Sequence, residues 1–73
     1  MPLRINIVTQ NQERIRLEAD RRETFLTLKK LIRVIKGYPI DTQDIYLNGI
    51  KLLDDDRISD LTDGQSLDLK ISL

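Results

Sequence analysis

The side chains in this 73-residue sequence that could do acid–base or metal chemistry are carboxylates. Residues 54–56 are three consecutive aspartates, and carboxylates of this kind bind calcium. The run lacks the glycine and the spaced ligands of a dedicated calcium loop, so we interpret it as a solvated acidic loop and expect no metal. Asp41, Asp44 and Asp60 could form an acid–base pair, but their spacing places no two of them beside a nucleophile.

The residue types that most enzymes rely on are missing from the sequence. It has no histidine and no cysteine, and so lacks the commonest general base and any thiol nucleophile. Serine occurs only at positions 59, 66 and 72. We therefore expect no enzyme activity and no cofactor. The lack of cysteine also fits a reducing compartment, which favours a cytoplasmic or nuclear protein.

Length and composition indicate a single domain over residues 1–73. No apolar run approaches the ~20 residues that span a bilayer, and there is no signal-peptide pattern, so we expect no membrane partner. The zero net charge and three aromatic residues argue against nucleic-acid binding. Residues 1–36 carry nine cations and four anions, whereas residues 37–73 carry three cations and eight anions. This split either orients a partner or draws the two halves of the fold together.

Two stretches near the N-terminus alternate apolar and polar residues with a period of two. In LRINIVT the apolar positions are 3, 5 and 7, and in RIRLEA they are 15, 17 and 19. Alternation of this length predicts two half-buried strands. The polar QNQE between them predicts a hairpin loop, with Asn11 suited to a left-handed conformation.

The period changes in TFLTLKKLIRVIKG, which predicts a helix of about three turns. Its apolar residues recur at three- and four-residue steps: Phe25, Leu28, Leu31, Ile32 and Ile35. Thr24 is the expected N-cap and Gly37 the expected C-cap. The following YPID ends the helix, because proline restricts both itself and the residue before it.

The stretch DIYLNGIKL returns to a period of two. Ile45 and Leu47 share one face, Tyr46 lies on the other, and the Asn-Gly pair at 48–49 predicts a two-residue hairpin turn. A polar connection follows, with Ile58 and Leu61 expected beneath it. The closing SLDLKISL predicts a last strand with one apolar face: Leu67, Leu69, Ile71 and Leu73.

The predicted fold class is α+β, with elements in the order ββαββ and a mixed sheet of four to five strands packed on one helix. This order resembles the β-grasp arrangement, and the segments themselves resemble those of the ubiquitin superfamily. TFLTLKKLI is similar to the start of the ubiquitin helix, and GYPIDTQDIYLNGIKL to the segment that follows it. RISDL and SLDLKISL are similar to the last segments. The similarity runs without gaps from Leu3 to about Leu61 and then needs a two-residue deletion.

The resemblance implies a protein-binding surface on the sheet. The family binds partners through an exposed patch of leucine, isoleucine and valine, and the matching positions here are Gln10, Tyr46 and Lys70. Tyrosine buries a large apolar area at modest entropic cost, which suits it to recognition. We therefore expect a site anchored by Tyr46 and completed by Gln10, Asn48, Ile50 and Lys70, with ubiquitin-interacting helices or ubiquitin-receptor domains as partners. The alternative is a surface aromatic that only shields its cross-strand neighbours.

The resemblance also bears on covalent conjugation. A modifier of this family ends in Gly-Gly, whereas this sequence ends in KISL, and the two arginines that engage the activating enzyme correspond to Asp44 and Ser72. Ile50 replaces one linkage lysine, and the matching Lys29 is largely structural in the family. We expect an interaction domain of a larger intracellular protein, not conjugated in this form. The alternatives are a modifier whose Gly-Gly tail follows Leu73 and a diverged or redesigned scaffold without a partner.

Two further features suggest a secondary interface. Arg4, Arg14 and Arg16 make the first two strands basic, and β-grasp domains bind small GTPases by strand addition with basic residues there. Binding of a small GTPase is therefore a further alternative function.

The helix also carries more apolar residues than a small core needs, at Leu26, Leu31 and Val34. Either these form a contact with a neighbouring domain or a weak homodimer, or the helix is rotated and buries them in a monomer.

Overall fold

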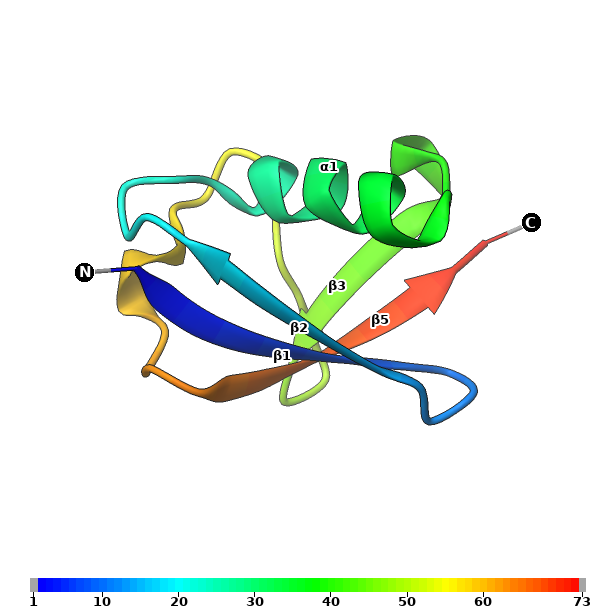
Figure 1. Ribbon diagram of the computed structural model, residues 1–73, viewed down its shortest axis with the longest axis horizontal. Helices are drawn as coiled ribbons and strands as arrows, with labels where there is room; N and C mark the ends of the chain where they lie inside the picture. Colours follow the sequence, from blue (N-terminus) through cyan, green and yellow to red (C-terminus); the bar gives the residue numbers. More distant parts are fainter. Residues whose placement is uncertain (1, 73) are drawn as a thin grey trace.

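Five strands form one mixed sheet, and a single α-helix packs across one face of it (Figure 1). This computed structural model describes residues 2–72. The elements are β1 (Leu3–Thr9), β2 (Arg14–Ala19), α1 (Phe25–Lys36), β3 (Gln43–Leu47), β4 (Ile50–Lys51) and β5 (Gln65–Ile71), with the short 3₁₀ helices η1 (Ile40–Thr42) and η2 (Ile58–Asp60). The predicted α+β, β-grasp fold is confirmed, with five strands.

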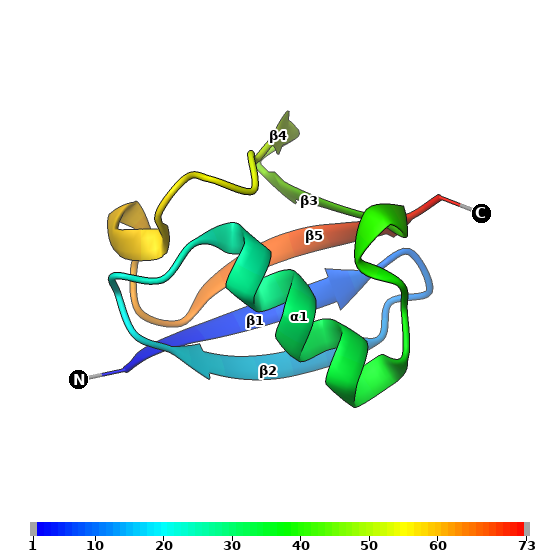
Figure 2. The same ribbon diagram turned by 90° about the horizontal axis from the view of Figure 1, so that it is seen from above.

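The strand order in the sheet is β2-β1-β5-β3-β4 (Figure 2). β1 and β2 form the predicted antiparallel hairpin, and β3 pairs antiparallel with both β4 and β5. The two central strands, β1 and β5, are parallel although they are the first and last in the chain. Parallel neighbours need a long connection between them, and here that connection contains β2, α1, β3 and β4.

The core lies between the sheet and α1, as the period-two pattern predicts. Fourteen apolar side chains are buried there: Leu3, Ile5, Ile7, Ile15, Leu17, Ala19, Phe25, Leu28, Ile32, Ile45, Ile58, Leu61, Leu67 and Leu69. Ile58 and Leu61 anchor the polar connection before β5, as expected. Ile71 is only partly buried, and Leu73 lies outside the described residues.

The two hairpin turns differ in how well the sequence predicts them. Asn48 and Gly49 have φ values of 51° and 83°, which confirms the two-residue turn. In the first hairpin the left-handed residue is Gln12, at φ 65°, so the prediction for Asn11 is wrong. The Gln12 N–H donates to the Thr9 carbonyl, and a three-residue loop of this type places its left-handed residue third, not second.

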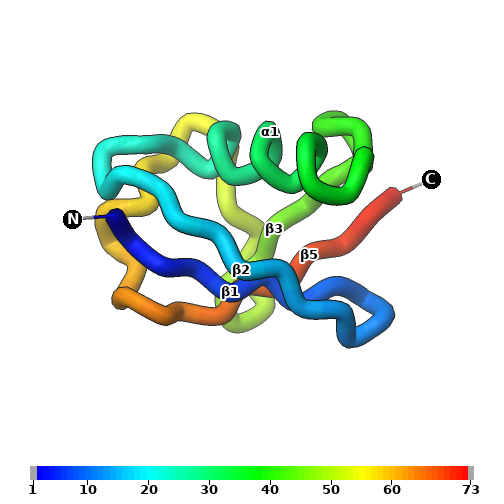
Figure 3. The backbone as a smooth tube through the Cα atoms, in the orientation of Figure 1, coloured from blue at the N-terminus to red at the C-terminus, as the bar shows by residue number. Residues whose placement is uncertain are grey.

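The helix begins and ends where predicted, but its N-terminus is stabilised differently. Gly37 is left-handed and its N–H donates to the Arg33 carbonyl, as expected for a C-cap. Thr24 occupies the N-cap position, but its side chain makes no capping hydrogen bond, which corrects that prediction. The Phe25 N–H instead donates to the Asp56 carbonyl at 3.0 Å. The trace in Figure 3 shows this loop passing the start of the helix.

The apolar face of α1 is narrower than its sequence suggests. Ile35, expected in the core, is 52% exposed and Val34 is 84% exposed. Leu26 and Leu31 are half-buried, and Leu31 packs against the core. The last turn of the helix extends past the buried set, which ends at Ile32. No helix among residues 2–72 has the length and apolar character needed to cross a membrane.

A buried lysine joins α1 to the segment before η2. Lys29 is 6% exposed, and its Nζ lies 2.6 Å from Asp54 Oδ1. The backbone carbonyl of Asp54 also accepts a hydrogen bond from the Leu26 N–H. Beneath this pair the buried amide of Gln43 donates from Nε2 to the carbonyls of Lys29 and Tyr38, both at 3.0 Å. The first aspartate of the acidic run is therefore part of the framework.

We predict that Lys29→Ala lowers the free energy of unfolding by about 3 kcal/mol, because it removes a buried aliphatic stem and leaves Asp54 without its partner. Lys29→Met keeps an aliphatic stem and should lower the free energy of unfolding by about half as much as Lys29→Ala does. Urea denaturation measures both values. Lys30→Ala, at the exposed neighbouring position, is the control and should change stability by less than about 0.5 kcal/mol. An equal loss of unfolding free energy in Lys29→Ala and Lys30→Ala would contradict the structural role of Lys29.

Candidate protein-interaction surface

The face of the sheet that points away from α1 carries one continuous row of side chains across all five strands. The register pairs Arg14 on β2 with Val8 on β1, and Val8 with Asp68 on β5. It then pairs Asp68 with Tyr46 on β3, and Tyr46 with Lys51 on β4. Facing residues on neighbouring strands have side chains on the same side of a sheet, so these five lie in line. Tyr46 and Val8 are the two apolar members of the row.

A shallow groove runs over this row. We call it the Tyr46 groove and define it by five residues that line it: Val8, Gln10, Tyr46, Asp68 and Lys70. They come from β1, the β1–β2 loop, β3 and β5. Tyr46 and Val8 are half-buried, whereas the other three are exposed. The groove therefore has a small apolar floor with a polar rim that includes both charge signs.

Local contacts hold the rim of the groove in place. The Ile71 N–H donates to Gln10 Oε1 at 3.0 Å, which ties the β1–β2 loop to the end of β5. On the other side of Tyr46, Lys51 Nζ lies 3.2 Å from Asp44 Oδ1, an ion pair between β4 and β3. Lys70 makes no ion pair with any residue from 2 to 72, so its ammonium group is open to a partner.

The structure brings together three of the five residues predicted for the main site. Gln10, Tyr46 and Lys70 all line the Tyr46 groove. Asn48 lies in the β3–β4 turn and is exposed, but does not line the groove. Ile50 is 70% exposed and pairs with Leu47, which places its side chain on the opposite side of the sheet from Tyr46. Tyr46 is therefore flanked by Lys51 rather than by Ile50.

Sequence reasoning missed two residues of the groove, Val8 and Asp68. Val8 is the one apolar residue at an outward position of β1, and that exception to the alternation is the signal that could have found it. Asp68 pairs with both Val8 and Tyr46, but strands β1, β3 and β5 are far apart in the sequence. No local pattern could reveal that contact.

The residues predicted for a secondary interface divide between two sides of the sheet. Arg14 and Arg16 are exposed on β2, at the edge of the sheet, and form no ion pair within residues 2–72. Leu31 and Val34 belong to α1, on the opposite face.

Carboxylates do not gather into a metal-binding group in the part of the chain that the structure describes: no cluster of three or more suitable side chains occurs there. Asp44 is paired with Lys51, and Asp54 with Lys29.

Comparison with known families identifies the chain. The model of the ubiquitin family matches residues 5–73, which is nearly the whole sequence. The chain belongs to the ubiquitin family. A search of curated proteins found no match to the chain.

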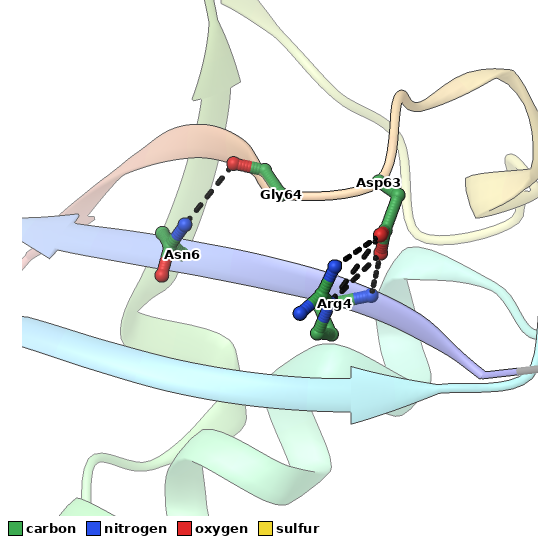
Figure 4. Close-up of polar contacts among 4 residues, drawn as sticks. All are labelled: Arg4, Asn6, Asp63 and Gly64. Atoms are coloured by element: carbon green, nitrogen blue, oxygen red, sulfur yellow. Dashed lines mark hydrogen bonds and ion pairs between the residues drawn. The ribbon is translucent and has the colours of Figure 1, made fainter.

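In this ubiquitin-family domain, Arg4 is engaged in the fold (Figure 4). Its guanidinium Nη2 lies 2.7 Å from Asp63 Oδ2, and its backbone N–H donates to Asp63 Oδ1 at 2.9 Å. Next to this pair, Asn6 Nδ2 donates to the Gly64 carbonyl at 3.0 Å. These bonds hold the start of β5 against β1, so Arg4 is the least available of the three basic residues predicted for a partner.

The same contacts set the pKa of the Asp63 carboxyl. Hydrogen bonds from the Arg4 side chain, and next from its backbone, lower that pKa from 3.8 to about 2. A carboxyl whose pKa is depressed in the folded state contributes stability that is fully present above its unfolded pKa. That contribution is lost as the pH falls through about 2.

We predict that Arg4→Ala raises the pKa of Asp63 from about 2 toward 3.8, without reaching it, because the backbone N–H of residue 4 still donates. A carbon-13 NMR titration of the aspartate carboxyl groups measures the change. Asp20, whose pKa is also lowered to about 2, by hydrogen bonds from Arg22, is the internal control and should not move. An unchanged Asp63 pKa in the variant would contradict the role of the guanidinium.

Proposed function

We propose that this ubiquitin-family domain is a non-catalytic interaction module that binds other proteins through the Tyr46 groove. Ubiquitin-family domains are generally non-catalytic. The observation that carries the proposal is the position of Tyr46, which is half-buried on the outer face of the sheet between the charged side chains of Asp68 and Lys51. An amphipathic ring held rigidly on a strand suits the anchor of a protein interface.

The chemistry of the groove favours a partner that combines apolar and acidic side chains. Val8 and Tyr46 offer apolar area, and the ammonium group of Lys70 is unpaired within residues 2–72. Asp68, between Val8 and Tyr46, would repel a carboxylate there, so an acidic group would approach over Lys70. An amphipathic helix with an apolar stripe and acidic flanks fits this arrangement, which is the character of ubiquitin-interacting helices.

We further propose that the domain is part of a larger protein of the cytoplasm or nucleus and is not conjugated. The burial of Lys29 in its ion pair with Asp54 argues against a modifier that forms chains through this lysine, because an acceptor lysine must reach a solvent-exposed thioester. Asp44, at a position where the family's modifiers carry arginine, supports the proposal as well, since its carboxylate is bound to Lys51.

We predict that Tyr46→Ala weakens binding of a ubiquitin-interacting helical peptide at least about tenfold, as expected when the central aromatic of an interface is truncated. Titration of the peptide into the nitrogen-15-labelled domain measures the affinity and maps the shifted amides. Those shifts should centre on Val8, Tyr46, Asp68 and Lys70. Tyr46→Phe keeps the ring and should bind within about threefold of the parent, because it loses one exposed hydroxyl.

The matched control is Val34→Ala, which truncates an exposed apolar residue on the far side of the sheet and should leave peptide affinity unchanged. Circular dichroism melts of all variants confirm that the fold is intact. If Tyr46→Ala binds as tightly as the parent while the domain stays folded, the Tyr46 groove is not the binding site.

We predict that an antibody to this domain detects, in denatured lysate of the source cells, one band well above 8.5 kDa that deconjugating enzymes do not change. Such a band indicates a domain within a larger chain. A ladder that survives boiling and collapses on deconjugation would indicate a covalent modifier and overturn the proposal.

A further inference from the structure

One edge of the sheet is open. β2 pairs with β1 on one side and has no neighbouring strand on the other among residues 2–72. Figure 2 shows β2 along this edge with α1 above it, whereas the opposite edge ends in the two-residue β4. An open strand of six residues presents unpaired N–H and C=O groups and is a template for pairing with another strand.

The backbone groups that face this edge belong to Arg14, Arg16 and Glu18. The Thr9 N–H donates to the Glu13 carbonyl at 2.9 Å, which makes these two a hydrogen-bonded pair. Hydrogen-bonded and non-hydrogen-bonded pairs alternate along an antiparallel ladder. The residues at 14, 16 and 18 therefore direct their N–H and C=O groups away from β1.

The other side of β1 supports this assignment. Arg4 lies opposite Glu18 in the ladder, yet its N–H donates to Asp63 and its carbonyl accepts the Gly64 N–H. Both backbone groups of Arg4 thus point toward β5, so they cannot bond to β2. The open edge offers three residues, each with a free donor and a free acceptor.

We propose that the β2 edges of two copies of this chain pair antiparallel, about a two-fold axis at Arg16, and join their sheets into one. In this register Arg14 of each copy lies opposite Glu18 of the other, and the three residues with outward backbone groups form the hydrogen-bonded pairs. Opposite charges on facing residues stabilise a strand pair. The charge pattern of β2 is therefore complementary to itself, which favours a second copy as the occupant over a foreign strand.

An apolar flank of α1 lies on the same side of the molecule. Lys29 and Arg33 line a second hollow, distinct from the Tyr46 groove, together with residues of β3 and β4. The opposite flank of the helix therefore faces β2. This flank carries Leu31, Val34 and Ile35, which are neighbours at three- and four-residue steps. Val34 and Ile35 are 84% and 52% exposed. In the paired sheets the two helices lie on the same face, and these flanks meet across the axis.

The facing Arg16 residues on the axis repel each other and limit the strength of the pair. We therefore expect a dimer that forms and dissociates between micromolar and millimolar concentration. Its distinguishing property is the register, because Arg14 and Glu18 are four residues apart on an extended strand, about 13 Å. They do not contact each other within one copy, so any coupling between them must pass between copies.

Sedimentation velocity over that concentration range tests the proposal on the whole chain. The parent mass should rise from 8.5 kDa toward twice that value. Arg14→Glu and Glu18→Arg each place like charges opposite each other at two equivalent sites, and each should weaken dimerisation about tenfold. The double swap, Arg14→Glu with Glu18→Arg, restores both pairs and should return the affinity to within about threefold of the parent.

Hydrogen exchange provides an independent readout of the same register. The amides of Arg14, Arg16 and Glu18 should become protected as concentration rises, whereas those of Ile15 and Leu17, already bonded to β1, should be protected throughout. Val34→Asp should weaken the dimer, and Ile50→Asp, at an apolar position that is 70% exposed at the opposite edge, should not. Thermal melts of each variant verify the fold.

Three results would overturn the proposal. The first is a chain that stays monomeric at millimolar concentration. The second is a double swap that dimerises no better than the single variants, which excludes this register. The third is protection of the β2 amides that appears only with an added extended peptide, which assigns the edge to a foreign strand.

Discussion

The parallel contact between β1 and β5 is the constraint on which the rest of this domain depends. Because the first and last strands lie side by side at the centre of the sheet, every other element belongs to the connection between them. That connection must cross the sheet, and α1 covers the apolar face as it does so. The same contact brings Val8 beside Asp68, which faces Tyr46 on its other side. Without it the Tyr46 groove would not exist.

The acidic segment before η2 shows how a charged run can belong to the framework. The sequence predicts a solvated loop for its aspartates, yet the backbone carbonyls of Asp54 and Asp56 accept hydrogen bonds from the first N–H groups of α1. Asp54 also binds the buried ammonium group of Lys29. Negative charge near a helix N-terminus is favourable, so the run suits its position electrostatically as well. One segment thus replaces the side-chain cap that Thr24 does not provide.

The outer face of the sheet and the β2 edge are separate surfaces with different chemistry. The Tyr46 groove is a mixed apolar and polar hollow over β1, β3 and β5, formed by side chains. The β2 edge offers backbone groups, with charged side chains on one face and the apolar flank of α1 on the other. The two surfaces are separate, because none of the residues that define the Tyr46 groove belongs to β2. Arg4, which pairs with Glu18 of β2 in the sheet, is held by Asp63 and does not line the groove.

The sequence alone determined the elements of this protein. Periods of two and of three to four residues, with Asn48-Gly49 and Gly37 at the turns, are local patterns that act between near neighbours in the chain. They predicted the α+β order, most of the core and the position of Tyr46 on the face of its strand opposite to Ile45 and Leu47. Tertiary structure decided what surrounds Tyr46, because it placed Asp68 beside the ring. The side of Ile50 follows already from the two-residue turn, which pairs Ile50 with Leu47. Tertiary structure also left Ile35 outside the core, since burial of a helical residue depends on where the sheet beneath it ends. Contacts between distant strands have no local signal, and for that physical reason the Tyr46 groove could be predicted only in part.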